Sequence, residues 1–299
     1  MTEADTARRQ GLLAAIGAYV IWGFLPLYLL LVITVPPVEF VGWRIIWTLP
    51  LCLVFIALRG QGAELRAALA NPRVLGWLAL SALLIGTNWL VYIWAVQTGE
   101  IYAASLGYYI NPLVNVLLGT ALLGERLTRA QWLAVGIAAL GVSFLLAGAL
   151  TTLWISLVLA ISFGTYGLVR KQVPVGSLPG LTIETLLLLA PAAAIAWSYA
   201  QGPEGSAFGQ DAGMSALIMA GGALTAVPLL LFALAARRLP YSTLGFIQFL
   251  SPSIVFVLGL TVFDRPLTTP QLACFACIWI AAAIFAFDLV RRSRAAAAS

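Results

Sequence analysis

The sequence predicts an all-α membrane protein with ten transmembrane helices in a 5+5 inverted-topology repeat and both termini cytoplasmic. Of its 299 residues, 62% are hydrophobic and 9% are charged, at a mean hydropathy of +1.00. Soluble domains carry charge on about a quarter of their residues, so a chain of this composition needs lipid around it. The spacing of its apolar stretches and a similarity between its two halves support the same class.

Ten apolar stretches approach the length of about 20 residues that a helix needs to cross a bilayer. They are expected near residues 11–32, 38–58, 73–97, 101–123, 129–148, 152–171, 179–200, 213–236, 241–263 and 267–290. With the N-terminus inside, the cytoplasmic segments hold all of the 16 basic residues except Arg44 and Arg265. The positive-inside rule therefore predicts that both ends are cytoplasmic. Because topology explains the basic loops, no nucleic-acid partner is expected.

The two halves share a proline-containing apolar segment. Residues 104–132 resemble residues 242–272 when the chain is shifted by about 140 positions, which places Pro112 on Pro252. Five spans per half is an odd number, so successive copies must lie in the membrane with opposite orientation. Transporters with such repeats bind their substrates at the repeat interface.

The repeats are expected in residues 1–150 and 151–299, forming one integrated transport domain. Proline lacks an N–H group and frees the carbonyl four residues before it. We therefore expect helix breaks at Pro26, Pro112 and Pro252.

Polar and aromatic side chains inside the first four stretches are candidates for the site. Arg44 is a functional candidate because a charge within the membrane is costly unless it is paired or hydrated, although a structural partner on another helix is an alternative. Glu39 is a candidate for proton coupling, or it reaches outer water. The remaining candidates for substrate binding in this half are Trp22, Asn88, Tyr92, Tyr109 and Asn111. An ordinary kink at Pro26 with an interfacial tryptophan is the alternative for Trp22, and interhelical hydrogen bonding is the alternative for Asn88.

The second half adds Tyr166 and Gln248 as substrate-binding candidates and Glu184 as a coupling candidate. Glu184 and Glu39 are expected at approximate mirror positions of the two repeats. A salt bridge from Glu184 to Arg170 or Lys171 is the alternative.

Metal and enzyme chemistry find little support in the sequence. The chain has no histidine, and Cys274 and Cys277 have the C-x-x-C spacing without a second pair, so no metal site is expected. The sequence contains no P-loop and no G-x-S-x-G motif, so we expect no ATP cofactor and no hydrolase activity.

Five motifs occur together along the chain. They are GYYINPL at 107–113, GERL at 124–127, the spacing of Glu39, Arg44 and Trp47, NWLVYIWAV at 88–96, and SFGTYGLVRK at 162–171. In this combination the chain resembles the RarD-type permeases of the EamA-like drug/metabolite transporter superfamily. The resemblance implies a bacterial cytoplasmic membrane location and export of small molecules. One departure is FDRPL at 263–267, where a second GERL would stand.

The predicted function is that of a secondary-active transporter, exporting small metabolites or drugs of amino-acid-like, aromatic or amine character by alternating access around a midplane cavity. Proton or ion coupling is left open. A channel-like or facilitative uniporter pore is the first alternative, and a non-transport membrane scaffold is the second. The expected partners are a small-molecule substrate and membrane lipids, with a monomer as the functional unit or a homodimer as the alternative.

Overall fold

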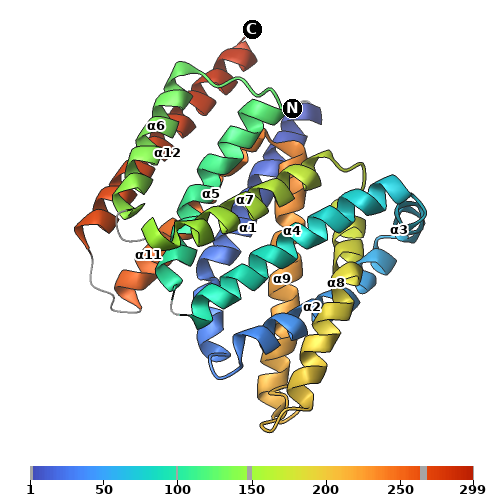
Figure 1. Ribbon diagram of the computed structural model, residues 1–299. Coiled ribbons are helices and arrows are strands. Elements are labelled where there is room, and N and C mark those ends of the chain that lie inside the picture. Colours follow the sequence, from blue (N-terminus) through green and yellow to red (C-terminus); the bar gives the residue numbers. More distant parts are fainter. Residues whose placement is uncertain (1–2, 99, 147–149, 263–267, 299) are drawn as a thin grey trace.

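The computed structural model describes residues 3–98, 100–146, 150–262 and 268–298, and its regular elements in these ranges are helices (Figure 1). The helices are α1 (Glu3–Leu31), α2 (Pro37–Leu58), α3 (Gly62–Leu69), α4 (Pro72–Gln97), α5 (Ile101–Leu122), α6 (Arg129–Leu146), α7 (Leu153–Gln172), α8 (Ser177–Ala200), α9 (Ala212–Arg238), α10 (Tyr241–Gln248), α11 (Leu250–Thr261) and α12 (Thr269–Ala298), with a short 3-10 turn, η1 (Leu150–Thr152), before α7.

Nine stretches within the described ranges are long and apolar enough to cross a membrane. They comprise α1, α2, α4, α6, α7, α8, α9, the pair α10–α11 taken together, and α12. Each coincides with a predicted stretch, which confirms the all-α membrane class. The tenth predicted span is α5, which does form a helix but falls outside this group. Its polar residues, Asn111 and Asn115 among them, lower its hydropathy, and its role as a span stays a prediction.

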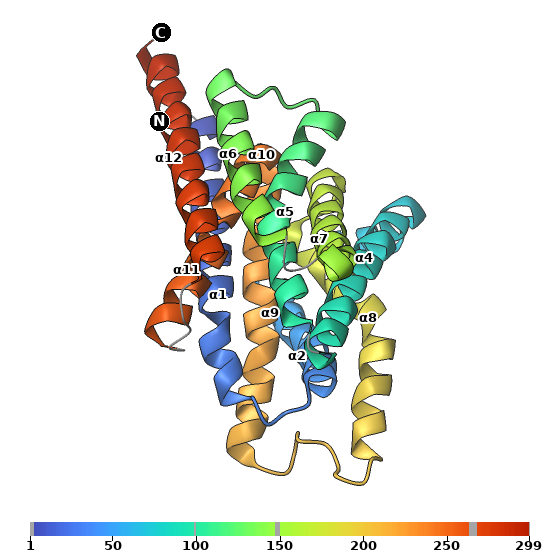
Figure 2. The ribbon, with the colours of Figure 1, turned by 60° about the vertical axis from the view of Figure 1, so that its left-hand side comes forward.

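Helices from the two halves of the chain pack directly against one another. α2 packs on α8, α5 on α10, and α6 on α12, while α1 packs on α9 and α4 on α7. The pairing of α6 with α12 forms one edge of the molecule in both ribbon views (Figures 1 and 2). Exchanging α1, α2, α4, α5 and α6 for α7, α8, α9, α10–α11 and α12 leaves this set of pairs unchanged. The two ends of the described chain lie at the same end of the molecule (Figure 1).

The expected helix breaks are largely wrong. α1 and α5 continue as helices through Pro26 and Pro112. A proline removes one backbone hydrogen bond, which a membrane helix tolerates when its neighbours pack around it. The second half differs, because its ninth stretch is divided at Phe249, three residues before Pro252, into α10 and α11.

Candidate functional site

A small cavity lies between helices of both halves. Its lining comes from α2, α4, α7, α8 and α9, and includes Thr48, Trp89, Tyr166, Glu184 and Thr225. The cavity has a volume of about 10 Å³. That is about the space one water molecule needs, so this conformation holds no room for a larger ligand.

Glu184 is held on the α7 side of this cavity by an ion pair. Its Oε1 atom lies 3.5 Å from Nε of Arg170, and both side chains are buried, at 2% and 1% exposure. Glu184 also accepts a hydrogen bond from Ser81 Oγ of α4, and Tyr166 of α7 lines the same cavity. Of the two partners considered from the sequence, Arg170 is confirmed, whereas Lys171 donates instead to the α9-end carbonyls.

Arg44 of α2 has a different environment. Its guanidinium carbon lies 4.6 Å from the ring centroid of Trp89, in a cation–π contact. The hydroxyls of Tyr28, Tyr92 and Tyr108 lie within electrostatic range of the guanidinium. Its buried Nε atom has no hydrogen-bond partner, and in the described part of the chain Arg44 forms no ion pair. The cation is thus surrounded by aromatic side chains and is not neutralised by a carboxylate.

The mirror relation expected between Glu39 and Glu184 stays a prediction, and the two residues differ in their distance from the helix start. Glu184 is the eighth residue of α8, and Arg44 is the eighth residue of α2. Glu39 is the third residue of α2 and lies nearer the helix end. Counted from the helix starts, Arg44 and not Glu39 is at the position of Glu184.

Glu39 is buried against the loop between α8 and α9. Its Oε1 accepts hydrogen bonds from Ser206 Oγ at 2.5 Å, from the Ala207 amide at 2.8 Å and from Trp43 Nε1 at 3.2 Å. The side chain is 1% exposed, so the expectation that it reaches outer water is wrong. These contacts give Glu39 a role in ordering the loop.

A buried amide network joins α5 to α10. Gln248 donates to Asn111 Oδ1 at 2.6 Å and accepts from Asn115 Nδ2 at 2.7 Å. Asn111 also donates to the Ala160 carbonyl of α7 at 2.8 Å, and the Tyr19 hydroxyl of α1 lies 3.5 Å from Gln248 Oε1. Two predicted residues, Asn111 and Gln248, therefore meet directly across the halves.

The remaining predicted residues are dispersed. Asn88 donates to the Leu159 carbonyl and to Ser162 of α7, which is the interhelical role named as its alternative. Tyr109 packs against Phe275 of α12, away from the cavity. Tyr92 contacts Tyr108 near Arg44.

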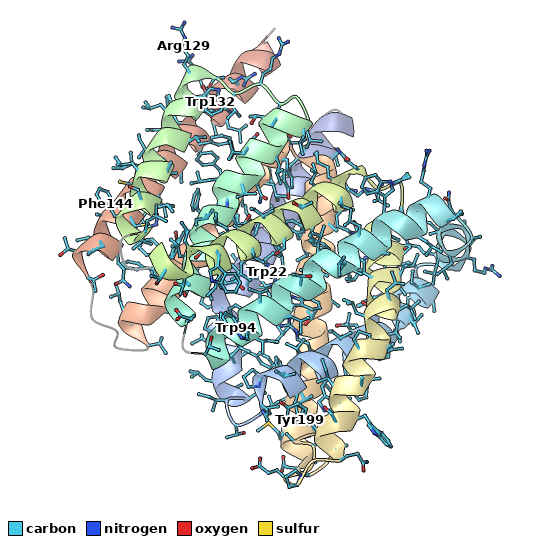
Figure 3. The ribbon with its side chains drawn as sticks, in the orientation of Figure 1. Trp22, Trp94, Arg129, Trp132, Phe144 and Tyr199 are labelled. Atoms are coloured by element: carbon cyan, nitrogen blue, oxygen red, sulfur yellow. The ribbon has the colours of Figure 1, made fainter. Side chains whose placement is uncertain are left out.

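Trp22 lies in the middle of the molecule (Figure 3), within contact of Tyr19, Phe163 and Phe232. The interfacial position considered for Trp22 is therefore wrong. The aromatic cluster joins α1 of the first half to α7 and α9 of the second.

Sequence reasoning missed several residues of these networks. Tyr19 and Trp89 look like ordinary lipid-phase aromatics in the sequence, and only their neighbours distinguish them. Glu125 of the GERL motif accepts hydrogen bonds from the amides of Tyr241 and Ser242, the first two residues of α10. This carboxylate caps the start of that helix, where it also complements the helix dipole. The second-half counterpart, 263–267, lies outside the described residues.

Comparison with known proteins places this architecture in a family. The model of the EamA-like transporter family matches residues 9–147, which run from α1 to the end of α6. An uncharacterized transporter of Pseudomonas aeruginosa is 44% identical to this chain over 96% of each protein. Protein RarD of Salmonella typhimurium is 43% identical over 96% of this chain and 97% of its own length. The chain belongs to the RarD-type, EamA-like transporters.

More distant matches agree with this membership. A protein of Pseudomonas aeruginosa named chloramphenicol-sensitive protein RarD is 31% identical over 95% of this chain and 96% of its own. A crystal structure with 19% identity superposes with a TM-score of 0.72, over 93% of this chain and 97% of that one, and shows a likeness of fold. This RarD-type protein is therefore a multi-pass membrane transporter, and the names of its relatives indicate transport and not catalysis.

Proposed function

We propose that this transporter is a secondary exporter of small metabolites or drugs bearing an anionic group, and that it works by alternating access around the central cavity. The observation that carries the proposal is the unneutralised Arg44 cation inside an aromatic surround beside that cavity. We place the protein in the bacterial cytoplasmic membrane with both termini inside, acting as a monomer.

Arg44 supplies the argument for an anionic group. A membrane-embedded charge is costly, and structural charges are accordingly paired, as Arg170 is with Glu184. Arg44 has no such partner among the described residues, yet Trp89 links it to the lining of the cavity. A substrate carboxylate would neutralise the guanidinium, and the surrounding rings would accept an aromatic or aliphatic body.

The size of the cavity favours a carrier over a channel. At about 10 Å³ it must enlarge before a metabolite can enter. The helices that line it come from both halves, so rocking one repeat against the other would open it toward one side at a time. The repeat boundary near residue 150 and the inverted relation of the halves are part of the proposal. The packing pairs that survive exchange of the halves support them.

Glu184 is our preferred coupling residue. It lines the cavity and shares its carboxylate between Arg170 of α7 and Ser81 of α4, so protonation would release partners on two other helices. Glu39 stays a second candidate, although its bonds to the outer loop tie it to one place.

Transport by the purified protein in proteoliposomes tests the substrate assignment. A thermal-shift screen of amino acids, quaternary amines and aromatic drugs first selects a ligand. The screen includes one matched pair, phenylalanine and phenylalanine amide, in which an uncharged amide group replaces the carboxylate. Losing a charge-assisted hydrogen bond costs about 1.5–3 kcal/mol, so Arg44→Gln is expected to weaken acid recognition by about ten- to a hundredfold. Arg44→Lys should retain part of it, and Arg73→Gln, an exposed arginine, serves as the control. Undiminished discrimination between acid and amide in Arg44→Gln contradicts the proposal.

Coupling is tested separately with an imposed pH gradient. Glu184→Gln is expected to abolish the dependence of transport on the gradient, while Glu39→Gln mainly lowers stability. If both variants keep the full dependence, coupling through a carboxylate is wrong. Currents that rise linearly with substrate concentration, without saturation, would favour the channel alternative.

A further inference from the structure

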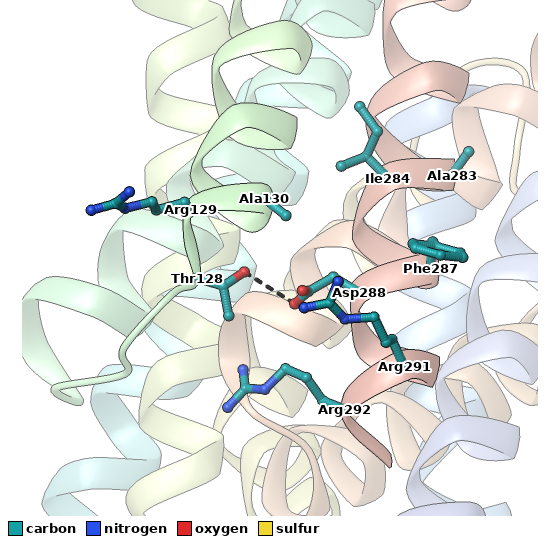
Figure 4. A pocket seen from close by; sticks show the side chains of 9 residues that line it. All are labelled: Thr128, Arg129, Ala130, Ala283, Ile284, Phe287, Asp288, Arg291 and Arg292. Atoms are coloured by element: carbon teal, nitrogen blue, oxygen red, sulfur yellow. Dashed lines mark hydrogen bonds between the residues drawn. The ribbon is translucent and has the colours of Figure 1, made fainter. Parts of the chain in front are cut away.

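A second cavity lies away from the one lined by Trp89 and Glu184, at the place where α6 begins and α12 approaches its end (Figure 4). Its volume is about 790 Å³. The lining consists of Thr128, Arg129, Ala130, Ala283, Ile284, Phe287, Asp288, Arg291 and Arg292. Nothing in the proposed transport cycle uses these residues.

The polar part of this cavity is positively charged. Arg129, Arg291 and Arg292 are exposed, and in the described ranges none of them forms an ion pair with a carboxylate. Asp288 is the one acid in the lining, is 7% exposed, and accepts a hydrogen bond from Thr128 Oγ1 at 3.0 Å. Three arginines against one aspartate leave positive charge in excess, presented to whatever enters the cavity.

The bounds of the spanning stretches put the arginines at the depth expected for lipid headgroups. The spanning stretch of α6 begins at Arg129, and that of α12 ends at Arg292. Next to the arginines, the floor of the cavity is apolar, made by Ala130, Ala283, Ile284 and Phe287. Phe287 is 71% exposed on a helix that crosses the membrane, so its ring faces acyl chains.

We propose that this cavity binds an anionic phospholipid, with its phosphate between the three arginines and an acyl chain along Ile284 and Phe287. Basic pockets between transmembrane helices recognise lipid headgroups through the same chemistry. A free phosphate would leave the apolar floor uncovered. A second copy of the chain on this face would bring two sets of like charges together, which disfavours a dimer there.

Binding is measured on the full-length, delipidated protein by native mass spectrometry and by the shift in melting temperature. The probes are phosphatidylglycerol, phosphatidylcholine and inorganic phosphate. Phosphatidylglycerol is expected to bind and to raise the melting temperature, and the other two are not. Because a basic residue at the membrane surface contributes about a fivefold gain in affinity, replacing Arg129, Arg291 and Arg292 together by glutamine should weaken binding about a hundredfold.

Two matched variants complete the test. Replacing Arg59, Arg66 and Arg73 by glutamine removes the same charge from an exposed segment at α3 and should leave binding unchanged. Replacing the three cavity arginines by lysine keeps the charge and should preserve most of the affinity, which separates binding from folding. Equal loss in the α3 variant, equal binding of phosphatidylcholine, full competition by inorganic phosphate, or a dimer that excludes lipid would each overturn the proposal.

Discussion

At the scale of single residues, the charged side chains within the helices differ in the kind of partner they have. Arg170 and Glu184 form an ion pair, and Oε1 of Glu39 accepts hydrogen bonds from Ser206 and Ala207, whereas its Oε2 has no hydrogen-bond partner. Among the described residues, Arg44 has a cation–π contact with Trp89 and no ion pair. A cation without a carboxylate partner is costly within a membrane, and for this reason Arg44 and not Arg170 is assigned to the substrate.

The Arg170–Glu184 pair allows stability to be separated from coupling. Breaking a buried pair costs about 3–5 kcal/mol, so Glu184→Ala should lower the melting temperature strongly, and Glu184→Gln less because it keeps the bond to Ser81. Joint replacement, Arg170→Met with Glu184→Leu, should restore much of the loss. Thermal unfolding in detergent measures the order, and a double variant no more stable than Glu184→Ala would show that the pair is not an isolated structural unit.

At the scale of elements, α5 and α10 approach each other closely. A Cβ atom added at Gly245 would lie 2.7 Å from the Pro112 carbonyl oxygen and 3.1 Å from Asn115 Cβ. This approach brings Gln248 onto Asn111 and Asn115. Pro112, predicted from the sequence as a helix break, therefore lies where the two halves of the chain touch.

Gly245→Ala is expected to push α10 away from α5, because the new methyl group would meet the backbone carbonyl of Pro112, which cannot rotate away. The amide side chains of the network would then lose their hydrogen-bond partners. Leaving a buried amide unpaired costs about 1–3 kcal/mol, so the melting temperature should fall. Gly259→Ala in α11 is the control, because a Cβ there meets nothing within 4 Å and alanine favours helix. Equal melting temperatures for the two variants would contradict the close approach.

At the scale of the whole molecule, the packing pairs keep their pattern when the two halves are exchanged. Five spans in each half stay a prediction, and α5 is the helix whose crossing is least supported by hydropathy. Residues 66 and 204 are separated by α4, α5, α6, α7 and α8. If all five cross, these two positions lie on opposite sides of the membrane.

Single-cysteine variants measure this topology, in a chain whose Cys52, Cys274 and Cys277 are replaced by alanine. A membrane-impermeant maleimide should label Glu204→Cys in intact cells and Arg66→Cys only after permeabilisation. Labelling of both positions from the same side would mean an even number of crossings between them and would remove α5 from the spans. Reversed labelling would keep the fold and invert its orientation.

Hydrophobic runs of bilayer length and the placement of basic residues are local properties, so the membrane class, the positions of the helices and the family resemblance could be predicted from the chain alone. The contact partners of individual side chains were harder to predict from the sequence, because they depend on how each helix is rotated and where it crosses its neighbours. Glu184 pairs with one of its two proposed partners, and Tyr109 packs against α12. Glu39 accepts hydrogen bonds from a loop that no sequence pattern linked to it. Arg44 and Glu184 are each the eighth residue of their helices, which could be counted only once both helix starts were known, because a helix start depends on tertiary packing as well as on local sequence.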